Sequence, residues 1–235
     1  MERDIIEKFP QSKTNFINEL NEGKPLLITY INNYSYLHFR RQPELFKKFD
    51  FITSDGIIFR LLLLLFYKKK TPRISPDFSS YFKEVFLKID KNKNSIFIWG
   101  ADEIALNLAI DNIKEQYPNI SIVGHQNGYL SKEDTQLEMK KIAKLNPNYI
   151  FVGMGTPKQE EVILGIKNEG WKGIGITCGA FISQIATNLN YYPSIINDLN
   201  LRWLYRVYKE PKLISRYLIL YPKAIIVFTY DYFRK

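Results

Sequence analysis

The sequence is poor in the residues that build disulfide and metal sites. One cysteine, Cys178, occurs among 235 residues, which excludes an intramolecular disulfide framework and fits a reducing compartment. We expect this thiol to pack at a strand end, because no base is evident that would activate it. The histidines are His38 and His125, and no acidic pair has Asp-x-Asp spacing, so a divalent-metal nucleotide-sugar site of the usual kind is not indicated.

Long apolar runs are also lacking. The most apolar stretches are Ile57–Tyr67 and residues 217–233, and the second is interrupted by Pro222, Lys223 and Asp231. Both fall short of the ~20 uninterrupted apolar residues that a membrane-spanning helix needs. The first residues mix charges with isolated apolar side chains and lack the apolar core of a signal peptide, so we expect a cytoplasmic protein.

The composition is that of an ordinary globular protein with a basic surface. Hydrophobic residues make up 46% and charged residues 24% of the chain, which excludes disordered and low-complexity classes. The formal charge of +9 attracts polyanions, phosphorylated small molecules or an anionic membrane leaflet, without choosing among them. The 16 Tyr and 16 Phe residues favour interfaces or the headgroup layer of a membrane.

Six short apolar runs alternate with helix-like patterns, which is typical of βα units around a mostly parallel sheet. The runs are PLLITYI, FDFITS, SIFIWG, ISIVG, YIFVGMG and GIGITCG. Because nearly every position in them is apolar, helices should cover both faces, and we predict a three-layer, Rossmann-like α/β fold. Several runs end in glycine, where a ligand can approach the backbone at the carboxyl ends of the strands. These glycines are Gly100, Gly124, Gly153 with Gly155, and Gly179.

The spacing of apolar residues also predicts two helices in the body. Residues 101–116 form an amphipathic helix, with Ile104, Leu108 and residues 110–113 turned inward. Ser131 begins a capping-box pattern, so we expect it to cap the next helix.

The character of the chain changes after Asn190, where Tyr, Trp, Leu and Arg become dense in two Pro-bounded helical segments. We predict an α/β catalytic domain over residues 1–190 and a helical appendage over residues 191–235. Basic residues recur in the appendage in steps of three or four, which places several on one helix face, where Arg side chains could grip a diphosphate. They are Arg202, Arg206, Lys209, Lys212 and Arg216. A solvated cationic face near a membrane is the alternative interpretation, and the two are compatible.

Asp55, in TSDGIIF, is the first candidate for chemistry. It follows an apolar run and precedes a glycine, so its carboxylate could face the ligand crevice and act as a general base on a sugar hydroxyl. The same SDG pattern also fits a helix cap or a turn.

The second candidate is the segment GMGTPKQEEVI at residues 153–163. Two glycines after a strand, a proline at a helix start, and Lys158 and Gln159 in its first turn form a plausible anion-binding or amide-reading site. The segment is neither a Walker A motif nor the dinucleotide fingerprint.

Two further pairs of residues leave alternatives open. Arg73 and Asp77, in TPRISPDFSS, either contact a phosphate or substrate or form a surface ion pair of little energy. Asn32 follows the first strand, and its side chain could hydrogen-bond a ligand. Asn33 could equally take this role, since a one-residue shift along a strand turns the side chain to the opposite face.

Read in order, these segments resemble the bacterial WecG/TagA/CpsF glycosyltransferases from about residue 25 to about residue 217. The resembling stretches are TYINNYSYL, DFITSDGI, PRISPDF, FIWGADEIA, YPNISIVGHQNGYL, PNYIFVGMGTPKQE, GIGITCGAF and LRWLYRVYKEPKLISRY. GMGTPKQE and LRWLYRVYKEP are the most specific.

The resemblance implies transfer of a sugar from a UDP-sugar, with anomeric inversion and without a metal or other cofactor, onto a polyprenyl-diphosphate-linked saccharide. Asp55 would be the base, and Arg206 and Arg216 would help hold the diphosphate. The aromatic appendage would rest on the inner face of the cell membrane. The remaining expected substrate-binding residues are Asn32, Arg73, Gly100, Asn127, Gly128, Gly153, Gly155, Lys158 and Gln159.

The sequence departs from the family between residues 182 and 193, where G-x-F-D and R-A-P patterns are common, so the donor sugar of a subfamily is not carried over. Pro76 stands where a glycine is common. A non-catalytic nucleotide or lipid-diphosphate binding module remains the alternative, and a homo-oligomer stays open. Nucleic-acid binding is disfavoured, because the basic residues are spread out and the aromatics concentrate in apolar helices.

Overall fold

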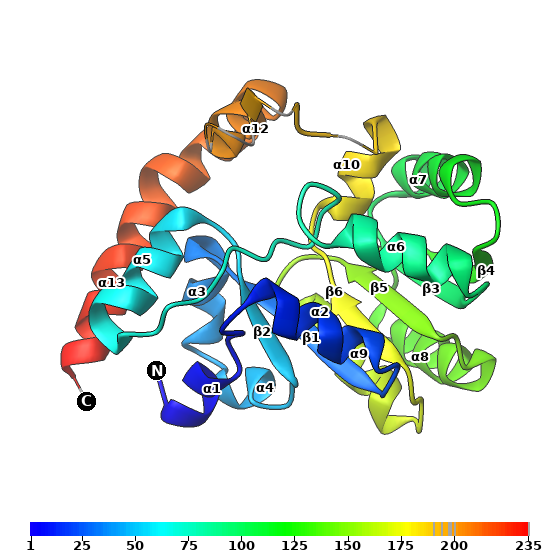
Figure 1. Ribbon diagram of the computed structural model, residues 1–235, viewed down its shortest axis with the longest axis horizontal. Helices are drawn as coiled ribbons and strands as arrows, with labels where there is room; N and C mark the ends of the chain where they lie inside the picture. The colour runs from blue at the N-terminus through cyan, green and yellow to red at the C-terminus, as the bar shows by residue number, and fades with distance from the viewer. Residues whose placement is uncertain (190, 194, 197–198, 200, 235) are drawn as a thin grey trace.

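The computed structural model describes residues 1–189, 191–193, 195–196, 199 and 201–234. At its centre is a six-stranded sheet in the order β2-β1-β6-β5-β3-β4, in which every neighbouring pair is parallel (Figure 1). The strands are β1 (Leu26–Ile31), β2 (Phe51–Ser54), β3 (Ser95–Gly100), β4 (Ser121–Gln126), β5 (Tyr149–Gly153) and β6 (Ile174–Thr177). The six predicted strands and the α/β class are confirmed.

Helices cover both faces of this sheet, as predicted. Each begins and ends as follows: α1 (Arg3–Glu7), α2 (Lys13–Asn21), α3 (Asn33–Phe39), α4 (Pro43–Phe46), α5 (Ile57–Tyr67), α6 (Phe82–Lys91), α7 (Glu103–Gln116), α8 (Lys132–Leu145), α9 (Lys158–Asn168), α10 (Phe181–Thr187), α12 (Arg202–Lys209) and α13 (Tyr221–Phe233). The 3₁₀ helix η1 (Pro211–Leu213) and the π-helix η2 (Arg216–Leu220) lie between α12 and α13. One core joins the sheet to α2, α6, α7 and α10, and another joins it to α8 and α9.

Strand burial follows the position of each strand in the sheet. All residues of the central strands β5 and β6 are buried, because helices cover them on both sides. The edge strand β4 instead alternates between exposed and half-buried residues. The prediction that β4 ends at Gly124 is wrong, since the strand continues through Gln126, and Gly124 lies opposite the Phe97 ring.

The inward face predicted for α7 is wrong in part. Asp102 caps the helix by accepting a hydrogen bond from the Ala105 N–H at 2.9 Å. The buried face contains Leu106, Ala109, Ile110 and Ile113, which follow one another at helical spacing. Ile104 and Leu108 are therefore 75% and 49% exposed.

The cap predicted for α8 is confirmed. The Ser131 side chain accepts a hydrogen bond from the Asp134 N–H at 3.0 Å, and the helix runs to Leu145. This cap satisfies a backbone donor that the first helical turn leaves unpaired.

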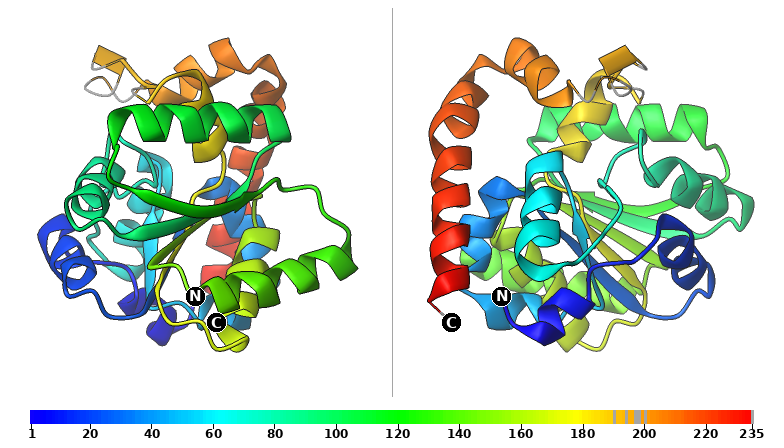
Figure 2. Two further views of the ribbon diagram at one scale, coloured as in Figure 1. Left: turned by 90° about the vertical axis from the view of Figure 1, so that its right-hand side faces the viewer. Right: turned by 60° about the vertical axis from the view of Figure 1, so that its left-hand side comes forward.

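The appendage, of which Arg202 to Phe233 carries the described helices, forms a strap along one edge of the body (Figures 1 and 2). Phe228 is buried in a cluster with Tyr36 of α3 and Phe59 of α5. Asp231 accepts hydrogen bonds from Arg40 at 2.7 and 2.8 Å. The predicted domain boundary falls at Asn190, which lies outside the described residues.

The prediction that the second apolar run is too short to span a membrane is contradicted by the helical stretch that contains it. Pro211–Phe233 spans 23 residues and is, by length and composition only, long and apolar enough to cross a membrane. Pro222 does not interrupt it, because it lies in the first turn of α13, where a missing N–H costs little.

Candidate active site

A cavity of about 990 Å³ opens at the carboxyl ends of the strands, between the body and the appendage. The ends of β1, β2, β5 and β6 contribute residues to its wall, and α12, η2 and α13 contribute residues from the other side. Such a place is where ligands bind in parallel α/β sheets.

Nine of the twelve substrate-site and catalytic residues predicted from the sequence line this cavity. They are Asn32, Asp55, Arg73, Gly128, Gly153, Gly155, Lys158, Arg206 and Arg216. The other three, Gly100, Asn127 and Gln159, do not line it. The Asn127 side chain donates to Glu103 and accepts from the Tyr129 N–H, so it shapes the loop.

Asp55 directly follows β2, and its carboxylate is held in place at the cavity. The Ser75 hydroxyl donates to Asp55 Oδ1 at 2.7 Å, and Arg73 Nη2 lies 3.8 Å from the same oxygen. The side chain is 29% exposed, so water and ligands can reach it. The helix-cap interpretation is not what the structure shows, because Gly56 is the N-cap of α5 and no side chain caps it.

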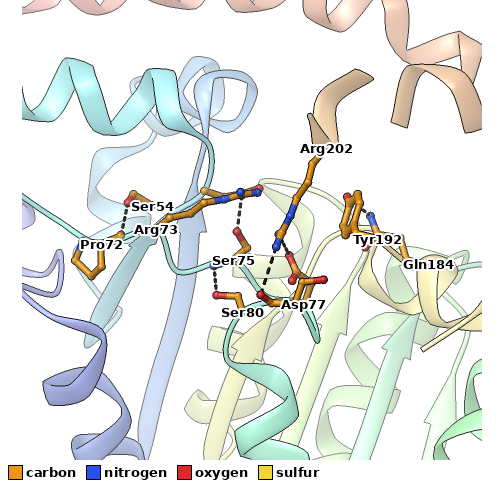
Figure 3. A network of polar contacts seen from close by, with 11 residues as sticks. Ser54, Pro72, Arg73, Ser75, Asp77, Ser80, Gln184, Tyr192 and Arg202 are labelled. Atoms are coloured by element: carbon orange, nitrogen blue, oxygen red, sulfur yellow. Dashed lines mark hydrogen bonds and ion pairs between the residues drawn. The ribbon is translucent and has the colours of Figure 1, made fainter. Parts of the chain in front are cut away.

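The loop between α5 and α6 carries both partners of Asp55 and a second carboxylate. Asp77 binds Arg202 of α12, with Nη1 2.9 Å from Oδ2, and Figure 3 shows Arg202 reaching it from the appendage. The ion pairs are therefore Arg73–Asp55 and Arg202–Asp77, and not Arg73 with Asp77. Burial raises the pKa of Asp77 to about 6, although Arg202 opposes the rise.

The structure distinguishes the two asparagines after β1. Asn32 caps α3, and its Oδ1 accepts a hydrogen bond from the Ser35 N–H at 2.9 Å. The Asn33 side chain lines the cavity, and both of its amide atoms are buried without a hydrogen-bond partner among the described residues. Asn33 therefore has the amide that is available to a ligand.

Buried polar atoms without partners gather around this cavity. Besides the Asn33 amide, the described ones include Arg73 Nε, Asp77 Oδ1 and Arg206 Nε, and all four residues line it. Leaving such an atom unpaired costs about 1–3 kcal/mol. Because these unpaired polar atoms gather around one cavity, the cavity is suited to a polar ligand that would supply their hydrogen-bond partners.

One wall of the cavity is made of glycine backbone. Gly155 and Gly179 have φ angles of 82° and 55°, and Lys158 donates to the Gly128 carbonyl at 2.8 Å. A Cβ atom on Gly153 would lie 2.5 Å from the Gly179 carbonyl oxygen, so the two loops pack backbone to backbone.

Gln159 supports this wall from behind. Its Oε1 accepts the Gly179 N–H at 3.1 Å, and its Nε2 donates to Glu160 Oε1 at 2.8 Å. Thr29 also donates to that oxygen, at 2.9 Å. Burial raises the pKa of Glu160 to about 7, which places an ionisable group under the cavity floor that the sequence analysis did not identify.

The basic residues of the appendage divide by type. Arg202, Arg206 and Arg216 line the cavity, whereas Lys209 and Lys212 are exposed. The Arg216 guanidinium lies 4.1 Å from the centre of the Tyr34 ring, which fixes its direction. The arginines therefore fit the diphosphate-gripping interpretation, and the lysines fit the solvated face.

Other residues of the site were missed by the sequence analysis. Tyr129 lines the cavity and is 79% exposed, and Tyr192 stacks on Arg202 at 4.8 Å. Cys178 is buried in the wall, as expected for a packing thiol, and burial raises its pKa. Over the described part of the chain, no group of three or more His, Cys, Asp and Glu side chains could hold a metal ion.

Comparison with known proteins identifies the family. The model of the Glycosyl transferase WecG/TagA/CpsF family matches residues 8–235. The chain belongs to this family.

Named relatives match over much of their length. The chain is 32% identical over 227 residues to a UDP-Gal:alpha-D-GlcNAc-diphosphoundecaprenol beta-1,4-galactosyltransferase of Shigella boydii, covering 96% of this chain and 93% of that protein. An N-acetylglucosaminyldiphosphoundecaprenol N-acetyl-beta-D-mannosaminyltransferase of Bacillus subtilis is 32% identical over 178 residues, covering 76% and 68%. A protein of the same name from Staphylococcus aureus is 34% identical over 139 residues, covering 59% and 52%.

The cavity of this WecG/TagA/CpsF glycosyltransferase is lined by most of the residues that the resemblance gives as its site. The match includes the appendage as well as the body, so the arginines that close the cavity belong to the family region. The predicted enzyme class, a glycosyltransferase, is confirmed.

Proposed function

We propose that the enzyme transfers a sugar from a UDP-sugar to a saccharide carried on polyprenyl diphosphate, with inversion at the anomeric carbon and without a metal ion. The product would serve the synthesis of a cell-surface polysaccharide or a teichoic-acid-type polymer. The observation that carries this proposal is a carboxylate, Asp55, oriented in a cavity whose other side presents arginines. The names of the two relatives from Shigella boydii and Bacillus subtilis support these substrate classes.

Asp55 is suited to act as the base. In the proposed reaction, its carboxylate takes the proton of the acceptor hydroxyl, and the acceptor oxygen bonds to the anomeric carbon of the donor. The bond between that carbon and the UDP oxygen breaks on the opposite face, which inverts the configuration. Ser75 and Arg73 hold the carboxylate in position for this role.

Positive charge and backbone donors are suited to stabilise the two diphosphates. UDP leaves with an added negative charge, which Lys158 and the nearby N-terminus of α9 would stabilise beside the glycine wall. Arg206 and Arg216 come from the appendage and would hold the acceptor diphosphate. The exposed ring of Tyr129 offers a surface on which the uracil could stack.

The exposed apolar side chains of the appendage support binding at the inner membrane surface. Trp203, Leu218, Ile226 and Phe233 are between 50% and 75% exposed. Since Asp231 and Phe228 hold α13 against the body, we propose that this helix lies on the bilayer instead of crossing it. Flotation with anionic phospholipid vesicles tests this, and protein that stays at the bottom of the gradient contradicts it.

The activity is tested by UDP release. Purified protein is incubated with a panel of UDP-sugars, including UDP-galactose and UDP-N-acetylmannosamine, and with a short-chain GlcNAc diphosphate acceptor. We expect release with one donor in the presence of EDTA, and a loss of about 10²–10⁴-fold in kcat for Asp55→Asn. Asp111→Asn, a change of an exposed aspartate on α7, is the matched control.

Two results would count against the enzyme proposal. No product with any donor is one, and full activity of Asp55→Asn is the other. UDP binding without turnover would favour the non-catalytic binding module instead.

A further inference from the structure

One side of the active-site cavity is apolar. Its side chains come from the start of α5 and from the appendage, which are more than 130 residues apart in the sequence but pack against each other along α13 (Figure 2). They are Ile57, Ile58, Trp203, Leu218, Pro222 and Ile225. Ile57 and Ile58 are 40% and 43% exposed and Leu218 is 69% exposed, so these three side chains are open to a ligand, whereas Ile225 also packs against the core. We call these six residues the apolar wall.

The apolar wall continues onto the outer surface of the protein. On α5, Leu61, Leu64 and Leu65 are 49%, 46% and 72% exposed. On the appendage, Ile219 and Ile226 are 63% and 70% exposed. Exposed apolar side chains gathered on neighbouring helices favour an interaction site, and here those helices also supply the apolar wall of the cavity.

The apolar wall also adjoins the cationic side of the cavity. Leu218 and Arg216 belong to the same π-helix, and Trp203 and Arg206 belong to α12. In a polyprenyl diphosphate the first isoprene carbon is bonded to a phosphate oxygen. A diphosphate held by these arginines therefore has its apolar chain next to them, where the apolar wall lies.

We infer that the apolar wall is a binding subsite for the first isoprene units of the lipid-linked acceptor. The rest of the chain leaves over the outer face of α5 and the appendage, toward the bilayer. This inference rests on the proposed acceptor class. It adds that the protein itself recognises the isoprenoid, so that lipid recognition does not depend on membrane binding alone.

The test uses soluble acceptors and no membrane. GlcNAc diphosphates that carry a methyl, a geranyl or a farnesyl group are compared by KM below their micelle-forming concentrations. In the wild type, we expect KM to fall at least tenfold from methyl to farnesyl, because apolar carbons leave water. Ile58→Ser and Leu218→Ser should raise KM for the farnesyl acceptor about tenfold and leave KM for the methyl acceptor unchanged.

The chain offers matched controls for both changes. Leu65 on α5 is 72% exposed against 43% for Ile58, and Ile219 on η2 is 63% exposed against 69% for Leu218, but neither Leu65 nor Ile219 lines the cavity. Leu65→Ser and Ile219→Ser should leave every KM in this membrane-free assay unchanged. If they act as strongly as the wall variants, the effect belongs to the general apolar surface and the subsite is refuted.

A binding readout separates the subsite from the reaction. Trp99 and Trp171 are buried, whereas Trp203 is 50% exposed on the apolar wall, so its fluorescence reports occupation. Farnesyl diphosphate should shift the emission to the blue, methyl diphosphate should not, and Trp203→Phe should lack the shift. The shift without turnover by any acceptor would support the subsite and refute the transferase. Turnover with equal KM for all chain lengths would refute the subsite and leave the transferase standing.

Discussion

Glu160 should make the stability of the fold depend on pH near neutrality. The side chain is fully buried, and its Oε1 accepts hydrogen bonds from Thr29, Thr156 and Gln159 at 2.8–3.3 Å. Its Oε2 is buried without a hydrogen-bond partner within the described residues. Burial thus raises the pKa of the carboxyl from 4.5 to about 7, even though the hydrogen bonds oppose the rise.

The sign follows from proton binding. Between pH 4.5 and about 7, the folded protein holds a proton on Glu160 that the unfolded chain has lost, so this group makes stability fall as pH rises through that window. One pKa unit corresponds to about 1.4 kcal/mol, so the rise from 4.5 to about 7 corresponds to about 3 kcal/mol. This loss of stability from ionising Glu160 is absent below pH 4.5 and complete above about pH 7.

Glu160→Gln removes this titration while keeping the shape of the side chain. Urea denaturation between pH 5 and 8 should show a flatter dependence of the unfolding free energy for the variant than for the wild type. Glu161→Gln, at the exposed neighbouring position, should keep the wild-type slope. Equal slopes for Glu160→Gln and the wild type would refute the reasoning, whatever the absolute stability of the variant.

The contacts and burial of the site residues also predict the outcome of two substitutions and of one labelling experiment. Arg202→Met should loosen the appendage, because it removes the ion pair with Asp77; faster proteolysis after residue 189 would show this, and an unchanged rate would contradict it. Gly153→Ala should lower the thermal midpoint, since its Cβ would lie 2.5 Å from the Gly179 carbonyl oxygen, costing about 1–3 kcal/mol; an unchanged midpoint would contradict this. Cys178 should react with maleimide only in denaturant, because it is buried and its pKa is raised; fast labelling of the native protein would contradict this.

The strands could be predicted because central parallel strands are buried on both faces and appear in the sequence as continuous apolar runs. The same logic failed at the edge strand β4, where every second residue is exposed and the strand continues past Gly124 to Gln126. On α7, the apolar residues of the sequence offered more than one helical face. The series Leu106, Ala109, Ile110 and Ile113 packs on the body, and Ile104 and Leu108 lie outside it.

The site residues that stand at the end of a strand could be predicted from the sequence. Asp55 and Gly153 stand at strand ends, so the topology alone brings them to one edge of the sheet. Partners from distant segments could not be paired in this way. The Arg202–Asp77 ion pair joins residues 125 positions apart, and the available amide of Asn33 depends on Asn32 being used as a cap.

The appendage matters to the site because it carries both the arginines and the apolar wall. If the appendage left the body, Asp77 would lose its ion pair with Arg202, and the loop that bears Arg73 and Ser75 would lose that support. In the closed arrangement that the structure shows, burial raises the pKa of Asp77 from 3.8 to about 6, although Arg202 opposes the rise, so this carboxyl holds its proton more tightly than a solvated one and favours closure less as pH rises through that window. With the appendage in place, the carboxylate of Asp55 faces the arginines before any substrate binds.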